Sequence, residues 1–207
     1  MKTFLYIDAF NLYFGAVRGT PYKWLDLQKL AKILLPRNDV VRIKYYTALV
    51  NARPQDPDQP FRQKAYLRAL KTLPNLEIFY GHFLTHIVKM FLANPVPGLP
   101  PLVEVVKTEE KGSDVNLASH LLLDAYRNRF ECAVVMTGDS DLLTPVQIVM
   151  EELRKPVGVI NPQKIPCRVL ERQATFYKHI RISALKKAQF PSQLKDEKGF
   201  VLKPGEW

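Results

Sequence analysis

Two carboxylates stand at the end of an apolar run in the second half of the chain. The run starts at Val134 and ends in the sequence Thr-Gly-Asp-Ser-Asp at 137–141. Such a run is typical of a buried parallel strand that leaves its sheet at the carboxyl edge, where open α/β sheets bind their ligands. Asp139 and Asp141 are therefore candidate catalytic or metal-binding residues, although Asp139 or Ser140 could instead cap the helix that follows.

The first residues of the chain repeat this pattern. The apolar run 3–7 ends at Asp8, and Asn11 follows three residues later. At this spacing the amide of Asn11 can hydrogen-bond Asp8 or a water molecule bound to a metal ion. We expect Asp8 at the same edge as Asp139, and the alternative is that it only caps the turn after the first strand.

A fourth carboxylate opens a predicted helix in the middle of the chain. Ser113 is a good N-cap for a helix from Asp114 to about Arg127. Asp114 shares its helical stripe with four apolar residues, Leu117, Ala118, Leu121 and Ala125. If the preceding run, 102–107, is a strand parallel to the others, Asp114 lies at the carboxyl edge. Asp124 falls away from this stripe and is not expected in the site.

Carboxylates crowded at one edge of a sheet repel one another, so they need a cation or must take up protons. Oxygen ligands alone suit a hard ion, Mg²⁺ or Mn²⁺. Such an ion can activate water and neutralise a phosphodiester during in-line displacement. The residue types therefore predict a metal site formed by Asp8, Asp114, Asp139 and Asp141.

The overall charge favours a polyanionic partner. The 207 residues carry 30 Lys and Arg against 20 Asp and Glu, which gives a net charge of +10. Nucleic acid is the simplest partner for such a surplus, and a basic protein without one is the alternative. The two cysteines lack metal-ligand spacing and favour a reduced, cytoplasmic location. No apolar stretch has the length needed to span a membrane.

Predicted strands alternate with predicted helices along most of the chain. This alternation indicates an open, mostly parallel sheet with helices on both faces, in a single domain over 1–182. A basic stripe on the helix 61–73 could track phosphates, but a solvated face is the simpler reading. The segment 82–92 is ambiguous and favours a strand, with a zinc site at His82 and His86 as a minor alternative. Residues 183–207 are expected as a loosely ordered basic tail whose lysines add nucleic-acid affinity, Lys186, Lys187, Lys195 and Lys198. The alternative is that this segment packs on the domain or on a second subunit through Phe190, Phe200 and Trp207.

Three short motifs together resemble the NYN domain family, a branch of the PIN-like nucleases that includes LabA-like bacterial proteins. They are Ile-Asp-Ala-Phe-Asn-Leu at 7–12, Lys-Gly-Ser-Asp-Val-Asn-Leu-Ala at 111–118 and Thr-Gly-Asp-Ser-Asp-Leu at 137–142. The resemblance covers roughly 1–182 and implies a Rossmann-like α/β/α sandwich with metal-dependent ribonuclease activity. It assigns the metal-site role to the four aspartates, with Asn11 and Ser140 as supporting polar groups. Lys111, in the second motif, is a candidate substrate-binding residue.

Other functional classes fit less well or remain open. A haloacid-dehalogenase-like phosphatase needs a second Asp at position 10, where this chain has Phe10. Neither the Gly-x-Gly-x-x-Gly fingerprint nor a phosphate-binding P-loop is present. The serious alternative is a non-catalytic RNA-binding or regulatory module that keeps the fold and the acids. A homo-oligomer is compatible with the sequence.

Overall fold

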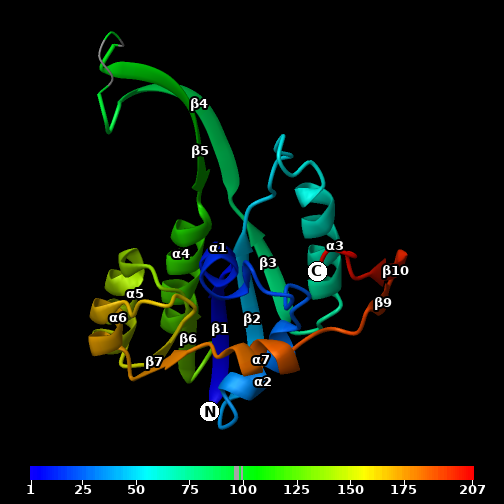
Figure 1. The fold of residues 1–207 in the computed structure, drawn as a ribbon. Coiled ribbons are helices and arrows are strands. Elements are labelled where there is room, and N and C mark those ends of the chain that lie inside the picture. The colour runs from blue at the N-terminus through cyan, green and yellow to red at the C-terminus, as the bar shows by residue number, and fades with distance from the viewer. Residues whose placement is uncertain (96–97, 99) are drawn as a thin grey trace.

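A six-stranded parallel sheet forms the centre of the molecule (Figure 1). The structure is a computed structural model that describes residues 1–95, 98 and 100–207. The sheet has the order β3-β2-β1-β6-β7-β8, and each neighbouring pair is parallel. The strands are β1 (Lys2–Asp8), β2 (Asp39–Thr47), β3 (Leu76–Tyr80), β6 (Cys132–Met136), β7 (Val157–Asn161) and β8 (Phe176–His179). All six therefore end at one edge of the sheet.

Helices cover both faces of this sheet. One face carries α4 (Ser113–Tyr126), α5 (Leu143–Glu151) and α6 (Arg168–Gln173), and the other carries α1 (Ala9–Leu12), α2 (Leu27–Leu34), α3 (Gln59–Lys71) and α7 (Ile182–Lys187). Alternate residues of β1 serve the two cores: Leu5 and Ile7 face one, and Phe4 and Tyr6 face the other. The expected Rossmann-like, PIN-like α/β/α sandwich is confirmed.

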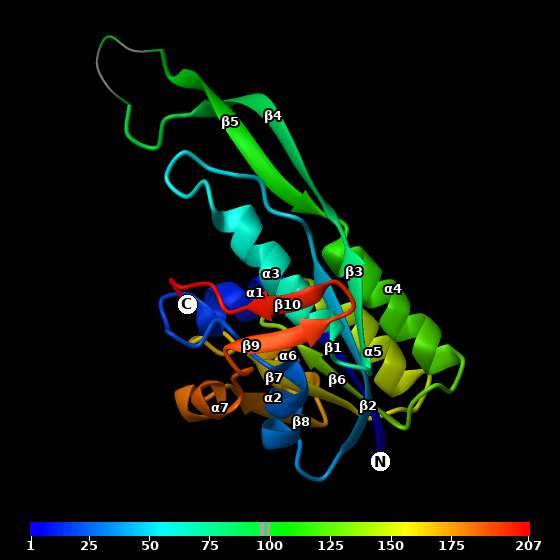
Figure 2. The same cartoon turned by 90° about the vertical axis from the view of Figure 1, so that its right-hand side faces the viewer.

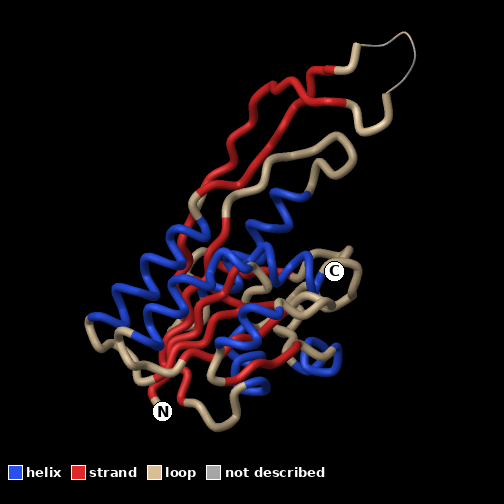
Figure 3. Tube along the Cα trace, turned by 90° about the vertical axis from the view of Figure 1, so that its left-hand side faces the viewer, coloured by secondary structure: helices blue, strands red, loops and turns tan. Residues whose placement is uncertain are grey.

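A long antiparallel arm leaves the body where β3 ends (Figure 3). It consists of β4 (His82–Phe91) and β5 (Leu102–Lys111), which pair along their whole length in a separate two-stranded sheet. The expectation that the run 102–107 is parallel to the central strands was wrong, because this run returns along β4. The polar residues 108–111 complete β5. The arm brings the chain back to the same edge, so α4 still begins there.

The predicted cap of α4 also differs from the structure. Gly112, with a φ of 98°, is the N-cap, and Ser113 is already the first residue of the helix. The side chain of Glu110 accepts hydrogen bonds from the backbone nitrogen of Ser113, at 3.2 Å, and from its Oγ, at 2.8 Å. A residue with a β-carbon is strained at this φ, so glycine makes the sharp entry into the helix possible.

Asp124 is buried, contrary to the expectation that it turns away from the core. Its side chain is 1% exposed and accepts hydrogen bonds from Lys44 Nζ at 2.5 Å and Tyr6 Oη at 2.8 Å. Arg129 Nη1 lies 3.0 Å from its other oxygen. The lysine comes from the neighbouring strand β2, a partner that helical periodicity does not reveal. Asp124 remains outside the site, as expected.

The C-terminal segment is ordered, and the expectation of a loosely ordered tail was wrong. It forms α7 and a hairpin of β9 (Gln193–Asp196) and β10 (Gly199–Leu202) that lies along α3 (Figure 2). Leu185, Phe190 and Val201 are buried in the core on that face of the sheet. Arg68 of α3 holds Asp196 through two hydrogen bonds of 2.9 and 2.8 Å. Apolar burial therefore fixes this basic segment on the body.

Two further expectations concern histidines and membranes. His82 and His86 lie in the extended strand β4, where residues four apart are separated by roughly 13 Å, so they cannot share a zinc ion. In the part of the chain that the structure describes, no helix is long and apolar enough to cross a membrane.

Candidate active site at the carboxyl edge

Asp8 ends β1 as a buried carboxylate held by three hydrogen-bond donors. Its side chain is 3% exposed. The backbone nitrogen of Asn11 donates to Oδ1 at 3.0 Å, Asn11 Nδ2 donates to Oδ2 at 2.6 Å, and Thr137 Oγ1 donates to Oδ2 at 3.3 Å. Burial raises the pKa of Asp8, the charge of Asp139 raises it further, and these hydrogen bonds oppose the rise. Asp8 is the N-cap of α1 and also lies at the carboxyl edge, so its capping role does not exclude a role in the site.

The turn after β6 brings the second acidic motif beside Asp8. Thr137 joins the two motifs, because its hydroxyl donates to Asp8 and accepts from the backbone nitrogen of Asp139 at 3.1 Å. Asp139 in turn accepts from the backbone nitrogen of Asp141 at 3.0 Å and caps the short 3₁₀ helix η2 (Ser140–Leu142). Asp139 is half-buried, whereas Ser140 and Asp141 are exposed.

Asp114 lies in the first turn of α4 and faces the same edge. Partial burial raises its pKa from the usual 3.8 to about 6. The charges of four other carboxylates contribute to this rise, those of Asp8, Asp139, Glu110 and Asp141. Such coupling requires that the carboxylates lie near one another, although Asp8 is more than a hundred residues from the other four in the sequence. We call Asp8, Asp114, Asp139 and Asp141 the acidic cluster.

The acidic cluster has the chemistry of a site for a hard cation. Its donors are carboxylate oxygens only, and besides burial their mutual repulsion raises the pKa of Asp114; a bound cation would relieve that repulsion. Within residues 1–95, 98 and 100–207, no three His, Cys, Asp or Glu side chains are arranged to hold a metal ion as they stand. Side-chain rotation would be needed for coordination, and exposed Asp141 has room for it.

Amide groups fix the position of Asn11, which in turn hydrogen-bonds Asp8. Asn11 Oδ1 accepts from the backbone nitrogen of Gly138 at 3.1 Å and from Gln163 Nε2 at 3.0 Å. Asn161, the last residue of β7, accepts from the backbone nitrogen of Gln163 at 2.8 Å. Asn11 therefore connects the turns that follow β1, β6 and β7. Sequence reasoning missed Asn161 and Gln163, although a polar residue ending the buried run 157–160 is the signal that identified Asp8.

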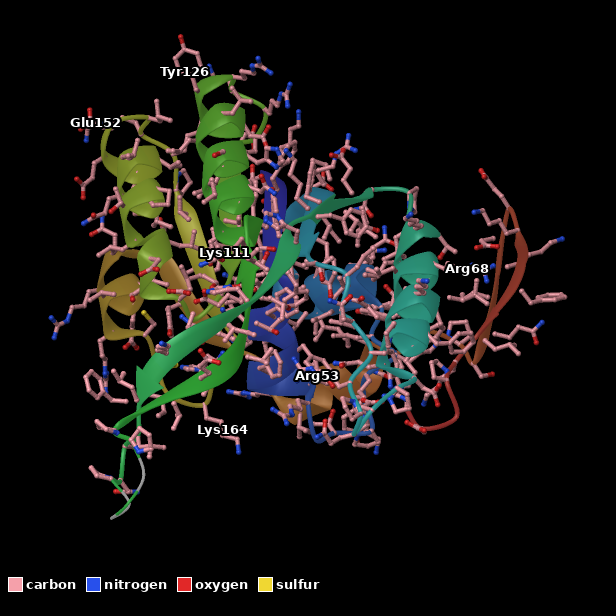
Figure 4. The ribbon with its side chains drawn as sticks, turned by 90° about the horizontal axis from the view of Figure 1, so that it is seen from above. Arg53, Arg68, Lys111, Tyr126, Glu152 and Lys164 are labelled. Atoms are coloured by element: carbon pink, nitrogen blue, oxygen red, sulfur yellow. The ribbon has the colours of Figure 1, made fainter. Side chains whose placement is uncertain are left out.

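The remaining predicted residue, Lys111, lies at the base of the arm. Figure 4, which looks onto the carboxyl edge, places it above the sheet close to the centre of the molecule. Its Nζ is 3.6 Å from Glu109 Oε2, and the side chain is half exposed. The ammonium group can therefore reach an anion at the edge. Its role in substrate binding stays a prediction.

A cavity of about 620 Å³ opens beside the acidic cluster. Asp8, Asp114 and Glu110 line part of it, together with Asn11. The rest of its lining comes mainly from α1, α3 and the loop after β2, and it includes aromatic and basic side chains. The volume falls in the range of roughly 300–1,000 Å³ that small-molecule sites occupy.

Comparison with known proteins agrees with this architecture. A protein of unknown function from Vibrio parahaemolyticus has a similar structure, with a TM-score of 0.56 at 15% identity, covering 87% of this chain and 94% of the other; that likeness shows the fold alone. The 6-hydroxy-3-succinoylpyridine 3-monooxygenase HspA of Pseudomonas putida is 29% identical, over all of this chain and 75% of the relative. The NYN domain, a PIN-like nuclease domain that generally acts on RNA, matches residues 2–183. This chain belongs to the NYN domain family.

Proposed function

We propose that this protein hydrolyses RNA phosphodiester bonds at the acidic cluster with the help of Mg²⁺ or Mn²⁺. The proposal rests on the arrangement of the acids: Thr137 hydrogen-bonds Asp8 and the backbone nitrogen of Asp139, and Asp114 lines the same cavity as Asp8. Burial and four neighbouring carboxylates raise the pKa of Asp114, which agrees with this arrangement. A cluster of this kind destabilises the protein unless a cation or protons neutralise it, so its presence calls for a functional reason. The net charge of +10 supports a polyanionic substrate.

Each residue has a distinct task in this proposal. Asp8, Asp114, Asp139 and Asp141 would hold the ion, and Asn11 and Thr137 fix the orientation of Asp8 through the hydrogen bonds described above. A divalent ion, when bound, would neutralise the phosphodiester and activate water for attack. Lys111 and Ser140 would contact the phosphate, because both are exposed at the same edge. The raised pKa of Asp114 makes cation binding compete with proton binding near pH 6.

A second candidate is the binding and turnover of a small heteroaromatic acid in the cavity. The name of the Pseudomonas putida relative describes a monooxygenase acting on a succinoylpyridine. The cavity supports this candidate, because its volume suits a small molecule and its lining includes aromatic and basic side chains. Calorimetric binding of 6-hydroxy-3-succinoylpyridine, combined with the absence of RNA cleavage, would favour this second candidate.

The test of hydrolysis is a cleavage assay on a fluorescein-labelled single-stranded RNA. Wild type should cleave it with Mg²⁺ or Mn²⁺ and lose activity in EDTA. Asp139→Asn should fold and lose activity by orders of magnitude, while Glu152→Gln, an exposed change on the far end of α5, should keep it. RNA binding without cleavage in either metal would instead identify a non-catalytic RNA-binding module. Equal cleavage by Asp139→Asn, with contaminating nuclease excluded, refutes the mechanism.

A further inference from the structure

Three packed phenylalanines line the cavity without belonging to either hydrophobic core. Phe10 stacks on Phe14 with ring centres 6.5 Å apart and an interplanar angle of 22°, and meets Phe83 edge-on at 5.7 Å. All three line the cavity, and none is part of the two core clusters that flank the sheet. Phe14 is 53% exposed. We call Phe10, Phe14 and Phe83 the aromatic wall.

The core does not account for the aromatic wall. These rings come from α1, the π-helical segment η1 (Tyr13–Val17) and the arm, so they assemble only in the folded chain. Burying a phenylalanine side chain is favourable by about 2–3 kcal/mol, yet Phe14 keeps half of its surface in water. An exposed ring that is held in place by another ring offers a flat face on which a planar ligand can stack.

Basic side chains line the same cavity beside the aromatic wall. The guanidinium carbon of Arg18 lies 5.4 Å from the centre of the Phe14 ring. Arg18, Lys23 and Arg53 all line the cavity, and within the described residues none of the three forms an ion pair. Arg53, on the loop after β2, lies over the carboxyl edge in Figure 4. Arg62 differs, because Asp56 and Glu206 hold it.

Beside the aromatic wall, the cavity therefore combines flat apolar surface with three basic side chains that form no ion pair within the described part of the chain. We infer that it binds a planar heteroaromatic ring on the aromatic wall, with an anionic arm of the same ligand held by Arg18 and Arg53. The ring and anion come either from a nucleotide of single-stranded RNA or from a free small heteroaromatic acid. The inference rests on the proposed use of this cavity, but ring binding needs no cleavage.

Tryptophan fluorescence provides a direct readout of this binding. The chain contains two tryptophans, and Trp207 lines the cavity while packing against Trp24 with ring centres 6.2 Å apart. A ring that enters the cavity should therefore change the emission. The probes are uridine 5′-monophosphate, nicotinic acid, an eight-nucleotide single-stranded RNA and ribose 5-phosphate, which has an anionic arm but no ring. EDTA in the buffer prevents metal-dependent cleavage during the titration.

Matched variants separate ring stacking from a general loss of aromatic surface. Phe14→Ala should weaken ring-bearing probes by roughly 5- to 100-fold, the range expected when a stacking side chain is removed. Phe61→Ala is the control, because Phe61 is 73% exposed on α3 and does not line the cavity. Phe14→Leu keeps apolar volume without the ring and should bind as weakly as Phe14→Ala. Arg53→Ala should weaken every anionic probe, and exposed Arg127→Ala should weaken none.

Each outcome decides between stated alternatives. Tighter binding of uridine 5′-monophosphate and RNA than of nicotinic acid identifies a nucleotide subsite, and the reverse order identifies a site for a free heteroaromatic acid. Equal binding of ribose 5-phosphate and uridine 5′-monophosphate, or equal effects of Phe14→Ala and Phe61→Ala, overturns the inference. If the wild type cleaves RNA but Phe14→Ala binds the ring-bearing probes as tightly as the wild type, only the ring subsite is refuted. If the protein binds the ring-bearing probes but does not cleave RNA, only the hydrolytic proposal is refuted.

Discussion

Replacing Asp114 by Asn removes an ionisable group whose pKa is raised to about 6 by partial burial and by the neighbouring carboxylates. Because the pKa is raised in the folded chain from 3.8 to about 6, the folded state binds more protons than the unfolded state between these values. Wild type therefore loses stability as the pH rises from about 4 to 6. Asn cannot ionise, so Asp114→Asn should be more stable than wild type at pH 8 and no more stable at pH 4.

The size of this gain follows from the difference between the two pKa values, which corresponds to roughly 3 kcal/mol when fully expressed. Asp114 is only half-buried, and water screens its neighbours, so about 1–2 kcal/mol is expected. For a chain of this length, each kcal/mol shifts the melting temperature by about 2–4 °C. Asp114→Asn should thus melt about 2–8 °C above wild type at pH 8.

Thermal unfolding followed by circular dichroism in EDTA measures this difference across pH 4–8. Glu152→Gln removes an exposed carboxylate outside the acidic cluster and should leave the melting temperature unchanged. A gain for Asp114→Asn that is the same at every pH would point to a packing effect rather than to ionisation. No gain at pH 8 would refute the reasoning, since the four carboxylates would then not repel Asp114 in solution.

Three further outcomes follow from the same structure. Adding Mg²⁺ should raise the melting temperature of wild type more than that of Asp139→Asn, because binding to the folded state stabilises it by mass action; equal shifts would remove Asp139 from the metal site. Lys44→Met should cost about 3–5 kcal/mol in urea denaturation by leaving Asp124 without its buried partner, and Lys44→Met combined with Asp124→Leu should recover most of it. A small cost of Lys44→Met alone would show that Tyr6 and Arg129 compensate the carboxylate without Lys44. Gly81→Ala should destabilise the protein by about 1–3 kcal/mol, because its β-carbon would lie 2.5 Å from the Lys111 carbonyl oxygen; an unchanged unfolding curve would contradict that close approach.

Local sequence patterns predicted the sheet and the position of the acids well. β1, β6 and β7 are short apolar runs, and a polar residue at or shortly after the end of each lies at the carboxyl edge, as Asp8, Asp139 and Asn161 do. The fold class is confirmed, and the roles of the acids stay predictions. Asp114 lines the same cavity as Asp8, although the condition stated for its position, a strand before α4 that is parallel to the central strands, is not met.

The predictions that failed concern residues whose positions depend on contacts with distant parts of the sequence. Asp124 lies beside the apolar stripe of α4, and only its contact with Lys44, 80 residues away in sequence, explains its burial. The basic composition of 183–207 favoured a loose tail, whereas three widely spaced apolar residues of this segment pack on the body, Leu185, Phe190 and Val201. Their partners lie on other elements, and of the three only Phe190 was a candidate for packing on the body. The cavity escaped notice for the same reason, because its aromatic wall assembles from separate segments.

The arm leaves and rejoins the body at almost one point, and this has a consequence for how such chains can vary. A β-carbon added to Gly112 would lie 3.7 Å from the α-carbon of Gly81, so the two crossing segments touch. Phe83 and Glu110 lie at the base of the arm and line the cavity, so that base must stay as it is. Beyond these two residues the arm can lengthen or shorten while the strands and helices of the body keep their positions. The outer arm is thus the part of this fold that can change its length and surface without altering the site.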